Sequence, residues 1–281
     1  MKPIGPSDEI VPPVRAEPVE ASATLRQAQG ERLRLQNTQL IGKPLATTYA
    51  NHTVWLLPEH ALWWLEGRVL FIADLHLGKA ATYRALGQPV PSGTTAENLR
   101  RLSELIQHYQ PAQLVFLGDF LHAAQARTAS VLSQLEAWRQ SHRDLNCTLV
   151  RGNHDSRAGD PPASLNIKVV NEPYLVGPFA ACHYPQTHST HTVLAGHVHP
   201  VVQLQGPARD RLRLPCFVLE ERSAILPAFG EFTGGYMVEP KPGVQLYAAG
   251  GGSVWSLSGL FKPAKTAEDR PLQALNKPVA Q

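Results

Sequence analysis

The sequence has few cysteines, no long hydrophobic run and little excess charge, and the first two scarcities each exclude a class of protein. The three cysteines among the 281 residues, at positions 147, 182 and 216, are dispersed and form no C-x-x-C pair. Neither a disulfide framework nor a zinc ribbon is therefore indicated. No apolar run approaches the length of a membrane span, and the N-terminus lacks the hydrophobic core of a signal peptide. We expect a cytoplasmic protein with no membrane partner.

The charge balance leaves the class of partner open. Lys and Arg together number 26 against 23 for Asp and Glu, which gives a net charge of +3. No long basic stripe is visible, but bound metal ions would add positive charge of their own, so nucleic acid is neither required nor excluded. A hydrophobic content of 43% is that of an ordinary globular protein.

The two ends differ in composition from the middle of the chain. Five prolines fall within the first 18 residues, and Glu, Gln, Arg and Ala dominate the next stretch of the chain. We expect residues 1–45 to form a disordered arm, residues 46–261 to form the folded domain, and residues 262–281 to form a flexible tail. Docking of a partner is an alternative role for the arm.

The first part of the domain has a parallel-sheet pattern. Apolar runs alternate with segments of helical periodicity, and a hairpin over 53–65 leads into the first of these runs. The expected strands are 69–73, 114–117 and 147–150. One expected helix begins at Thr94, and a second covers residues 129–142.

After residue 156 the apolar stretches become short and are separated by turns at Gly, Pro and Asn. They predict a second, largely antiparallel sheet with a hairpin turn at Gly250–Gly252. The stretches are 167–170, 174–176, 201–204, 216–219 and 224–226. We therefore expect an α/β fold of two face-packed sheets with helices outside and functional residues in loops along one edge.

Asp74 and His76 follow the apolar run 69–73 with one residue between them. In an extended chain residues i and i+2 point the same way, so we expect the carboxylate and the imidazole to leave the strand side by side. An oxygen and a nitrogen ligand in that position suit a divalent cation.

The same arrangement recurs four more times along the chain. Potential ligands follow apolar runs, where open α/β sheets place their sites, and three of them directly follow a glycine that allows close backbone approach. The recurring segments are Gly118-Asp119, Gly152-Asn153-His154-Asp155, His183, and Gly196-His197-Val198-His199. Such an ordered series is hard to explain as packing alone.

This series resembles the motifs of the calcineurin-like binuclear metallophosphoesterases, whose fold is a two-sheet αββα sandwich. Cys182 stands where that superfamily often has Gly, which matters little because the imidazole of His183 is the ligand. The resemblance implies two metal ions, with Asp119 as the natural bridge. One ion would take Asp74, His76, Asp119 and His199, and the other Asp119, Asn153, His183 and His197. Oxygen and nitrogen ligands without thiolate favour manganese, iron or magnesium-like ions over structural zinc.

Two further histidines have implied catalytic roles. His154 follows a ligand, and we expect it to face the phosphate and to protonate or stabilise the leaving oxygen. Gly-Asp-x-x-His122 resembles the DNA-repair nuclease branch, in which this histidine orients the catalytic one. Lys79 and Arg84 lie next to Asp74-Leu-His76 and are candidates for holding the substrate phosphate, or they are simply solvated.

Four segments narrow the resemblance to the DNA-ligase-associated metallophosphoesterases. They are 73–84, 89–95, 118–122 and 226–235, within a similarity that spans about residues 50–262. The family implies a manganese-dependent endonuclease that acts on single-stranded DNA in DNA repair. It also implies an ATP-dependent ligase, a helicase and an exonuclease as partners.

Two alternatives remain open. A small-molecule phosphodiesterase or phosphatase could use the same site, and only substrate tests separate it from a nuclease. A non-catalytic scaffold of the same fold would be expected to have lost ligands, whereas the set is intact here.

Overall fold

The computed structural model describes residues 42–85, 87–90, 93–205, 210–231 and 233–258. The expected N-terminal arm lies outside the described residues up to position 41, as does the chain from residue 259, and the roles expected for both ends stay predictions. The folded domain begins slightly earlier than expected. Lys43 forms a β-bridge with Ser253, and the first strand starts at Leu45.

The first sheet combines an antiparallel half with a parallel half. Its described strands follow chain order across the sheet, antiparallel from β1 to β4 and parallel from β4 to β7. They are β1 (Leu45–Tyr49), β2 (His52–Leu57), β3 (Ala61–Trp64), β4 (Val69–Ile72), β5 (Gln113–Leu117), β6 (Asn146–Val150) and β7 (Lys168–Val170). The predicted hairpin over 53–65 is confirmed as β2 and β3.

The assignment of the stretch 167–170 to the second sheet is wrong. β7 pairs parallel with β6 in the register Thr148 to Lys168. A parallel partner needs a crossover of a dozen or more residues, and the segment 151–167 is long enough to supply one. The apolar stretch alone did not indicate which sheet it would join.

The helices lie in the crossovers of the first sheet. They are α2 (Lys79–Ala85), α3 (Thr94–Tyr109), α4 (Ala129–Ser141) and α5 (Asn153–Ala158), with 3-10 turns η1 (Ala124–Ala126) and η2 (Ala163–Leu165). α3 and α4 confirm the predicted helices, each burying an apolar stripe, and the Thr128 hydroxyl caps α4 by accepting from the Val131 N–H. Among the described residues no helix is both long and apolar enough to span a bilayer.

The second sheet is mostly antiparallel, as predicted. Its order is β14-β11-β12-β13-β10-β9-β8; β15 pairs with β12, and β16 pairs with β15. The pairs β9–β10, β10–β13 and β11–β14 are parallel. The strands are β8 (Tyr174–Val176), β9 (Phe179–Ala181), β10 (Thr192–Ala195), β11 (Pro200–Gln205), β12 (Arg211–Leu219), β13 (Ser223–Ile225), β14 (Tyr236–Met237), β15 (Gln245–Gly250) and β16 (Ser253–Ser256).

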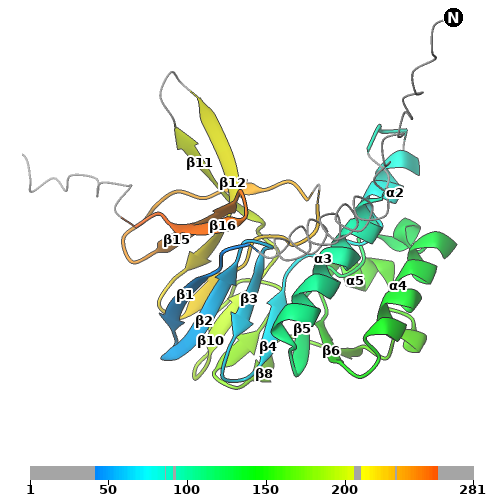
Figure 1. The fold of residues 1–281 in the computed structure, drawn as a ribbon, viewed down its shortest axis with the longest axis horizontal. Helices are drawn as coiled ribbons and strands as arrows, with labels where there is room; N and C mark the ends of the chain where they lie inside the picture. The colour runs from blue at the N-terminus through cyan, green and yellow to red at the C-terminus, as the bar shows by residue number, and fades with distance from the viewer. Residues whose placement is uncertain (1–41, 86, 91–92, 206–209, 232, 259–281) are drawn as a thin grey trace, which may run out of the picture. The chain divides into compact units, whose positions relative to one another are not determined.

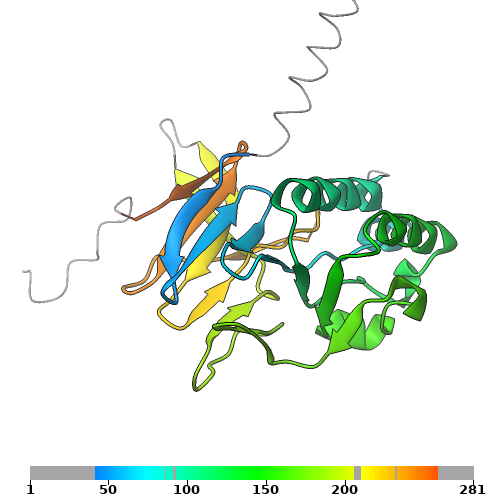
Figure 2. The same ribbon diagram turned by 60° about the horizontal axis from the view of Figure 1, so that its bottom comes forward.

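The two sheets pack face to face around an apolar core (Figures 1 and 2). Phe71 of the first sheet meets Phe179 of the second edge-to-face, with ring centroids 5.9 Å apart. This confirms the α/β class with two packed sheets.

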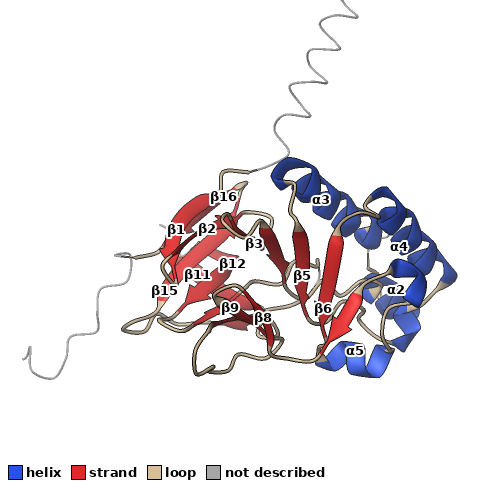
Figure 3. Ribbon diagram, turned by 90° about the horizontal axis from the view of Figure 1, so that it is seen from below, coloured by secondary structure: helices blue, strands red, loops and turns tan. Residues whose placement is uncertain are grey.

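The described helices gather over the outer face of the first sheet (Figure 3). The outer face of the second sheet carries Val202, Cys216 and Val218, packed against Val238 and Val244. The second outer helical layer of an αββα sandwich is therefore not seen among the described residues. Short connections, such as residues 196–199 and 220–222, leave no room for helical crossovers there.

The Trp64 ring constrains the turn between β8 and β9. It packs edge-to-face on Phe179 at 5.5 Å, and a Cβ placed on Gly177 would lie 2.1 Å from its Cη2 atom. We expect Gly177→Ala to lower the free energy of unfolding by about 2–4 kcal/mol, because a steric clash adds to a left-handed backbone. Urea denaturation measures the change.

Gly243→Ala is the matched control, because Gly243 is also left-handed and a Cβ there meets open space. It should cost only about 1–2 kcal/mol. Equal losses in the two variants would show that Trp64 does not constrain the turn.

Candidate metal centre

The loops at the carboxyl ends of the core strands meet at one edge of the two sheets. The His76 N–H donates to the Asp119 carbonyl at 2.8 Å, which joins the loops after β4 and β5. The His197 N–H donates to Asp74 Oδ2 at 2.8 Å, which joins a loop of the second sheet to one of the first. The predicted metal ligands, although distant in sequence, are therefore brought together.

One set of atoms, called the first group here, surrounds the Asp74 carboxylate. Its members are Asp74 Oδ1, His76 Nε2, Asp119 Oδ2 and His199 Nε2. His199 Nε2 lies 3.3 Å from His76 Nε2 and 3.5 Å from Asp74 Oδ1. His76 Nε2 lies 3.7 Å from Asp119 Oδ2.

The second group surrounds His183. Its members are Asp119 Oδ1, Asn153 Oδ1, His183 Nε2 and His197 Nδ1. His183 Nε2 lies 2.8 Å from Asn153 Oδ1, 3.1 Å from His197 Nδ1 and 3.5 Å from Asp119 Oδ1. Asp119 thus offers one carboxylate oxygen to each group, which is the arrangement required of a bridging ligand.

The donor chemistry of both groups fits divalent cations. Asp74 is completely buried, and its Oδ1 has no hydrogen-bond partner among the described residues. Burial, aided by the charge of Lys79, holds the pKa of His76 far below its ordinary value, so this imidazole is neutral and can offer a lone pair. Buried carboxylate oxygens and imidazole nitrogens that converge without thiolate suit two ions of the manganese, iron or magnesium kind.

Backbone carbonyls behind the groups orient two of the imidazoles. His183 Nδ1 donates to the Leu117 carbonyl at 3.1 Å, and His199 Nδ1 donates to the Thr233 carbonyl at 3.1 Å. Each bond places the proton on Nδ1 and leaves the Nε2 lone pair facing its group.

The backbone of the ligand loops is left-handed at five positions. The φ angles are +51° at Asp74, +45° at His76, +48° at Asp119, +69° at His197 and +51° at His199. β4 ends at Ile72, so the expectation that Asp74 and His76 leave an extended strand side by side is wrong. They reach the same group because two left-handed residues bend the loop, a conformation that costs about 1–3 kcal/mol at each position.

His154 lies at the start of α5 next to the shared carboxylate. Its Nε2 is 3.9 Å from Asp119 Oδ2, and its side chain is 31% exposed, so a substrate can reach it. His154 Nδ1 donates to the main-chain carbonyl of His122 at 2.6 Å, and the two imidazoles stack at 5.0 Å. The expected orienting contact exists, but the backbone of His122 makes the hydrogen bond and its ring contributes only stacking.

The two cationic candidates occupy different places on α2. Lys79 is buried beside the first group; burial lowers its pKa, and the charges of Asp119 and Asp74 oppose that shift. Arg84 lies in the last turn, exposed, with its Nη1 3.4 Å from the Val90 carbonyl. Lys79 is therefore the candidate that the fold brings to the ligand carboxylates.

Asp155 has a role that the sequence motif alone did not reveal. Its buried carboxylate accepts from the N–H groups of Gly152, Phe120 and Leu121 at 3.0, 3.0 and 3.2 Å. Burial raises its pKa to about 6, against the effect of these donors. Asp155 thereby ties the loop that follows Asp119 to the loop that carries Asn153.

The segment 226–235 supports the first group from behind. The N–H groups of Phe229 and Gly230 donate to the carbonyls of Ala73 and Asp74 at 2.9 and 3.1 Å. Together with the hydrogen bond from His199 to the Thr233 carbonyl, these bonds hold two ligand loops in place. The segment 226–235 therefore has a structural role in the site.

Two motif glycines are required by close approach. A Cβ on Gly152 would lie 2.4 Å from Asp119 Oδ1, and one on Gly196 would lie 2.5 Å from Asp74 Oδ2. Any side chain at either position would displace a ligand carboxylate.

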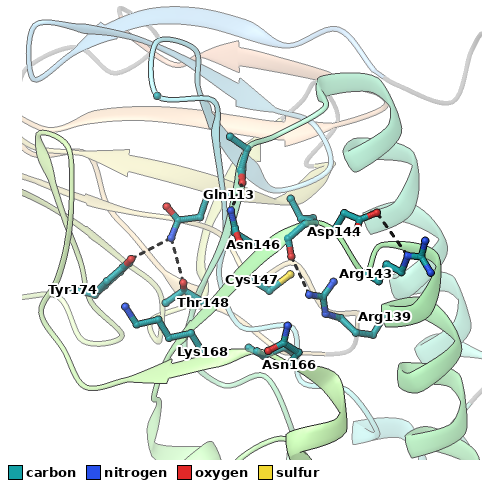
Figure 4. Close-up of a pocket in the computed structure, with 14 residues that line it drawn as sticks. Gln113, Arg139, Arg143, Asp144, Asn146, Cys147, Thr148, Asn166, Lys168 and Tyr174 are labelled. Carbon is teal, nitrogen blue, oxygen red and sulfur yellow. Dashed lines mark hydrogen bonds and ion pairs between the residues drawn. The ribbon is translucent and has the colours of Figure 1, made fainter.

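A cavity of about 560 Å³ lies at the opposite edge, where β5, β6 and β7 begin (Figure 4). Several of its polar side chains bind one another or the backbone. Gln113 Nε2 donates to Thr148 Oγ1 and Tyr174 Oη, both at 3.2 Å, and Arg139 Nε donates to the Leu165 carbonyl at 2.7 Å. No predicted site residue is among the described residues that line it, so the chemistry belongs to the two groups.

The role of Asp155 can be tested with an isosteric change. In Asp155→Asn the side-chain NH2 group faces at least one backbone donor, so we expect the free energy of unfolding to fall by about 1–3 kcal/mol and bound metal to decrease. Urea denaturation and elemental analysis measure both.

Asp160→Asn serves as the control, because Asp160 forms an exposed pair with Arg151 at 2.8 Å. It should cost at most about 1 kcal/mol and leave the metal content unchanged. If Asp155→Asn behaved in the same way, Asp155 would not be needed to join the loop after Asp119 to the loop that carries Asn153.

The comparisons with known proteins agree with this geometry. Residues 67–181 match the family described as calcineurin-like phosphoesterases, a family that binds two divalent metal ions. The crystal structure of the nuclease MPE from Pseudomonas putida is 48% identical, with a TM-score of 0.69 over 76% of this chain and 100% of that one. YfcE, a phosphoesterase from E. coli, is 17% identical with a TM-score of 0.33 over 64% of this chain and 86% of that one, which is too distant to bear on function. No curated protein matches significantly. The chain belongs to the calcineurin-like phosphoesterase family.

Proposed function

We propose that the protein is a manganese-dependent endonuclease that cleaves single-stranded DNA in DNA repair. The observation that supports this most directly is the 48% identity with a protein named as a nuclease, over the whole of that protein's length. An ATP-dependent ligase, a helicase and an exonuclease are the partners proposed with it, in the cytoplasm.

In the proposed reaction, each of the two groups of side chains would hold one metal ion. The first group would hold one ion and the second group the other, with Asp119 shared. Two such ions, when bound, polarise the phosphodiester and supply a nucleophile from water. Lys79 adds positive charge beside the first group, where it can attract the phosphate.

The burial of the ligands favours a flexible substrate. Asp74, Asp119 and His183 are all buried, so a phosphate must come close to a recessed centre. A single strand can bend its phosphate inward, whereas a duplex resists bending. A small phosphodiester could also enter, which keeps a small-molecule phosphodiesterase or phosphatase as the second candidate function.

His154 is the candidate for the leaving group. Its Nδ1 is occupied by the His122 carbonyl, so Nε2 is the nitrogen available to a departing oxygen. Cleavage of DNA expels a poor alkoxide that needs a proton or an equivalent partner, and a positioned acid contributes ~10²–10⁴-fold.

The proposed function predicts metal-dependent cleavage of labelled single-stranded DNA. Wild type with manganese should cut single strands faster than linear duplex, and a chelator should abolish the activity. Asp119→Ala should abolish cleavage and lower the bound metal, because both groups lose a ligand; Asp160→Ala, an exposed carboxylate, is the control. Turnover that survived exhaustive chelation would exclude the two-ion centre. Cleavage of small phosphodiesters without any cleavage of DNA would favour the second candidate function.

The role of His154 predicts a bias between substrates. His154→Ala should slow DNA cleavage by ~10²–10⁴-fold but slow a nitrophenyl phosphodiester much less, because nitrophenolate leaves without a proton. His122→Ala should show the same bias more weakly, since the main-chain carbonyl that holds His154 remains. Rates on both substrates are measured beside metal content. Equal slowing of both esters with the metals retained would assign His154 to the phosphate oxygens instead.

A further inference from the structure

Tyr184 presents an aromatic ring at the edge of the second group. Its ring centroid lies 4.5 Å from that of His197 and 4.9 Å from that of His183. It nevertheless remains 42% exposed. The ring therefore contacts both imidazoles and keeps part of its surface in solvent.

The backbone beneath this ring is held by one carboxylate. Glu172 Oε2 accepts from the N–H of His183 at 2.7 Å and from the N–H of Tyr184 at 3.0 Å. The same acceptor therefore positions a metal-ligand candidate and the exposed tyrosine that follows it. The backbone that carries the ring is therefore tied to the loop between β7 and β8.

The hydroxyl of Tyr184 makes no hydrogen bond to any other described residue, although the ring contacts two imidazoles. Exposed aromatic rings near a phosphate-binding centre are the platforms on which proteins stack the bases of single strands. Stacking uses the π-face, so it tolerates any base.

We propose that the exposed face of Tyr184 is a nucleobase subsite, on which the base next to the cleaved phosphate stacks. The proposal rests on the proposed function, since it assigns the substrate strand a second point of contact. It gives a role to a large aromatic ring that stays open beside the buried imidazole of His183. It also gives single strands an advantage, because bases paired in a duplex are not free to turn onto the ring.

The test asks whether removing the Tyr184 ring and removing a base of the substrate abolish the same interaction. Oligonucleotides carry one ordinary phosphodiester among phosphorothioates, with an abasic residue placed at each position on either side of it. For wild type, one of these abasic positions should lower kcat/KM about tenfold, which corresponds to ~1.4 kcal/mol of stacking. Tyr184→Leu should lose a similar factor on the intact strand and show no further loss on the abasic one.

Two variants complete the test, and metal content is measured for each. Tyr184→Phe keeps the ring and should keep the abasic penalty. Trp255→Leu removes another exposed aromatic side chain, on β16, and should leave the intact-strand rate and the abasic penalty as in wild type.

Three results would overturn the subsite. The first is a wild-type cleavage rate that is unchanged by an abasic residue at every flanking position, a result that needs no variant. The subsite would also be overturned if the losses of kcat/KM from Tyr184→Leu and from the abasic residue were additive. The same holds if the loss of kcat/KM in Tyr184→Leu were explained by its lower metal content alone. Failure of wild type to cut any DNA would instead overturn the proposed nuclease function.

Discussion

The candidate metal centre depends on one carboxylate, whose two oxygens face different groups of ligands. Asp119 Oδ2 lies near His76 and Oδ1 lies near His183, so the two groups stay together only while this side chain keeps its place. The His154 N–H donates to Oδ1 at 2.9 Å. Behind it Gly152 lacks a side chain, and Asp155 holds the next two backbone N–H groups of the Asp119 loop. The position of the shared ligand is therefore fixed by tertiary contacts rather than by its own strand.

Holding ligands in this way requires backbone conformations that most side chains avoid. Five ligand residues are left-handed, and each costs about 1–3 kcal/mol. The cost is offset by hydrogen bonds between loops, such as Gly230 to Asp74 and Gly196 to His183, and by the apolar core between the sheets. The left-handed ligand residues lie in the loops, while the ends of the strands that lead into these loops are buried.

The sequence predicted the parts of the molecule whose pattern is local. Apolar runs indicated the central strands, helical periodicity indicated α3 and α4, and the polar residues after the runs indicated the site. It failed where the answer lies in tertiary contacts. α2 and α5 span one or two turns, too few for a periodic stripe. β7 joined the first sheet because of its crossover. Asp74 and His76 converge through a bent loop, and the partner of His154 is a main-chain carbonyl that side-chain motifs cannot reveal.

The two proposed substrate contacts lie on segments that follow strands of different sheets. His154 follows β6 and lies against Asp119 and His122, whereas Tyr184 follows β9 and lies against His183 and His197. A phosphate placed at the shared carboxylate would therefore have its leaving oxygen directed toward one loop and a neighbouring base toward the other. Two contacts on opposite parts of one nucleotide step restrict how a strand can lie, even without base-specific hydrogen bonds. In this arrangement the selectivity for a single strand and the orientation of cleavage would both come from the packing of two sheets that bring these loops to the same edge.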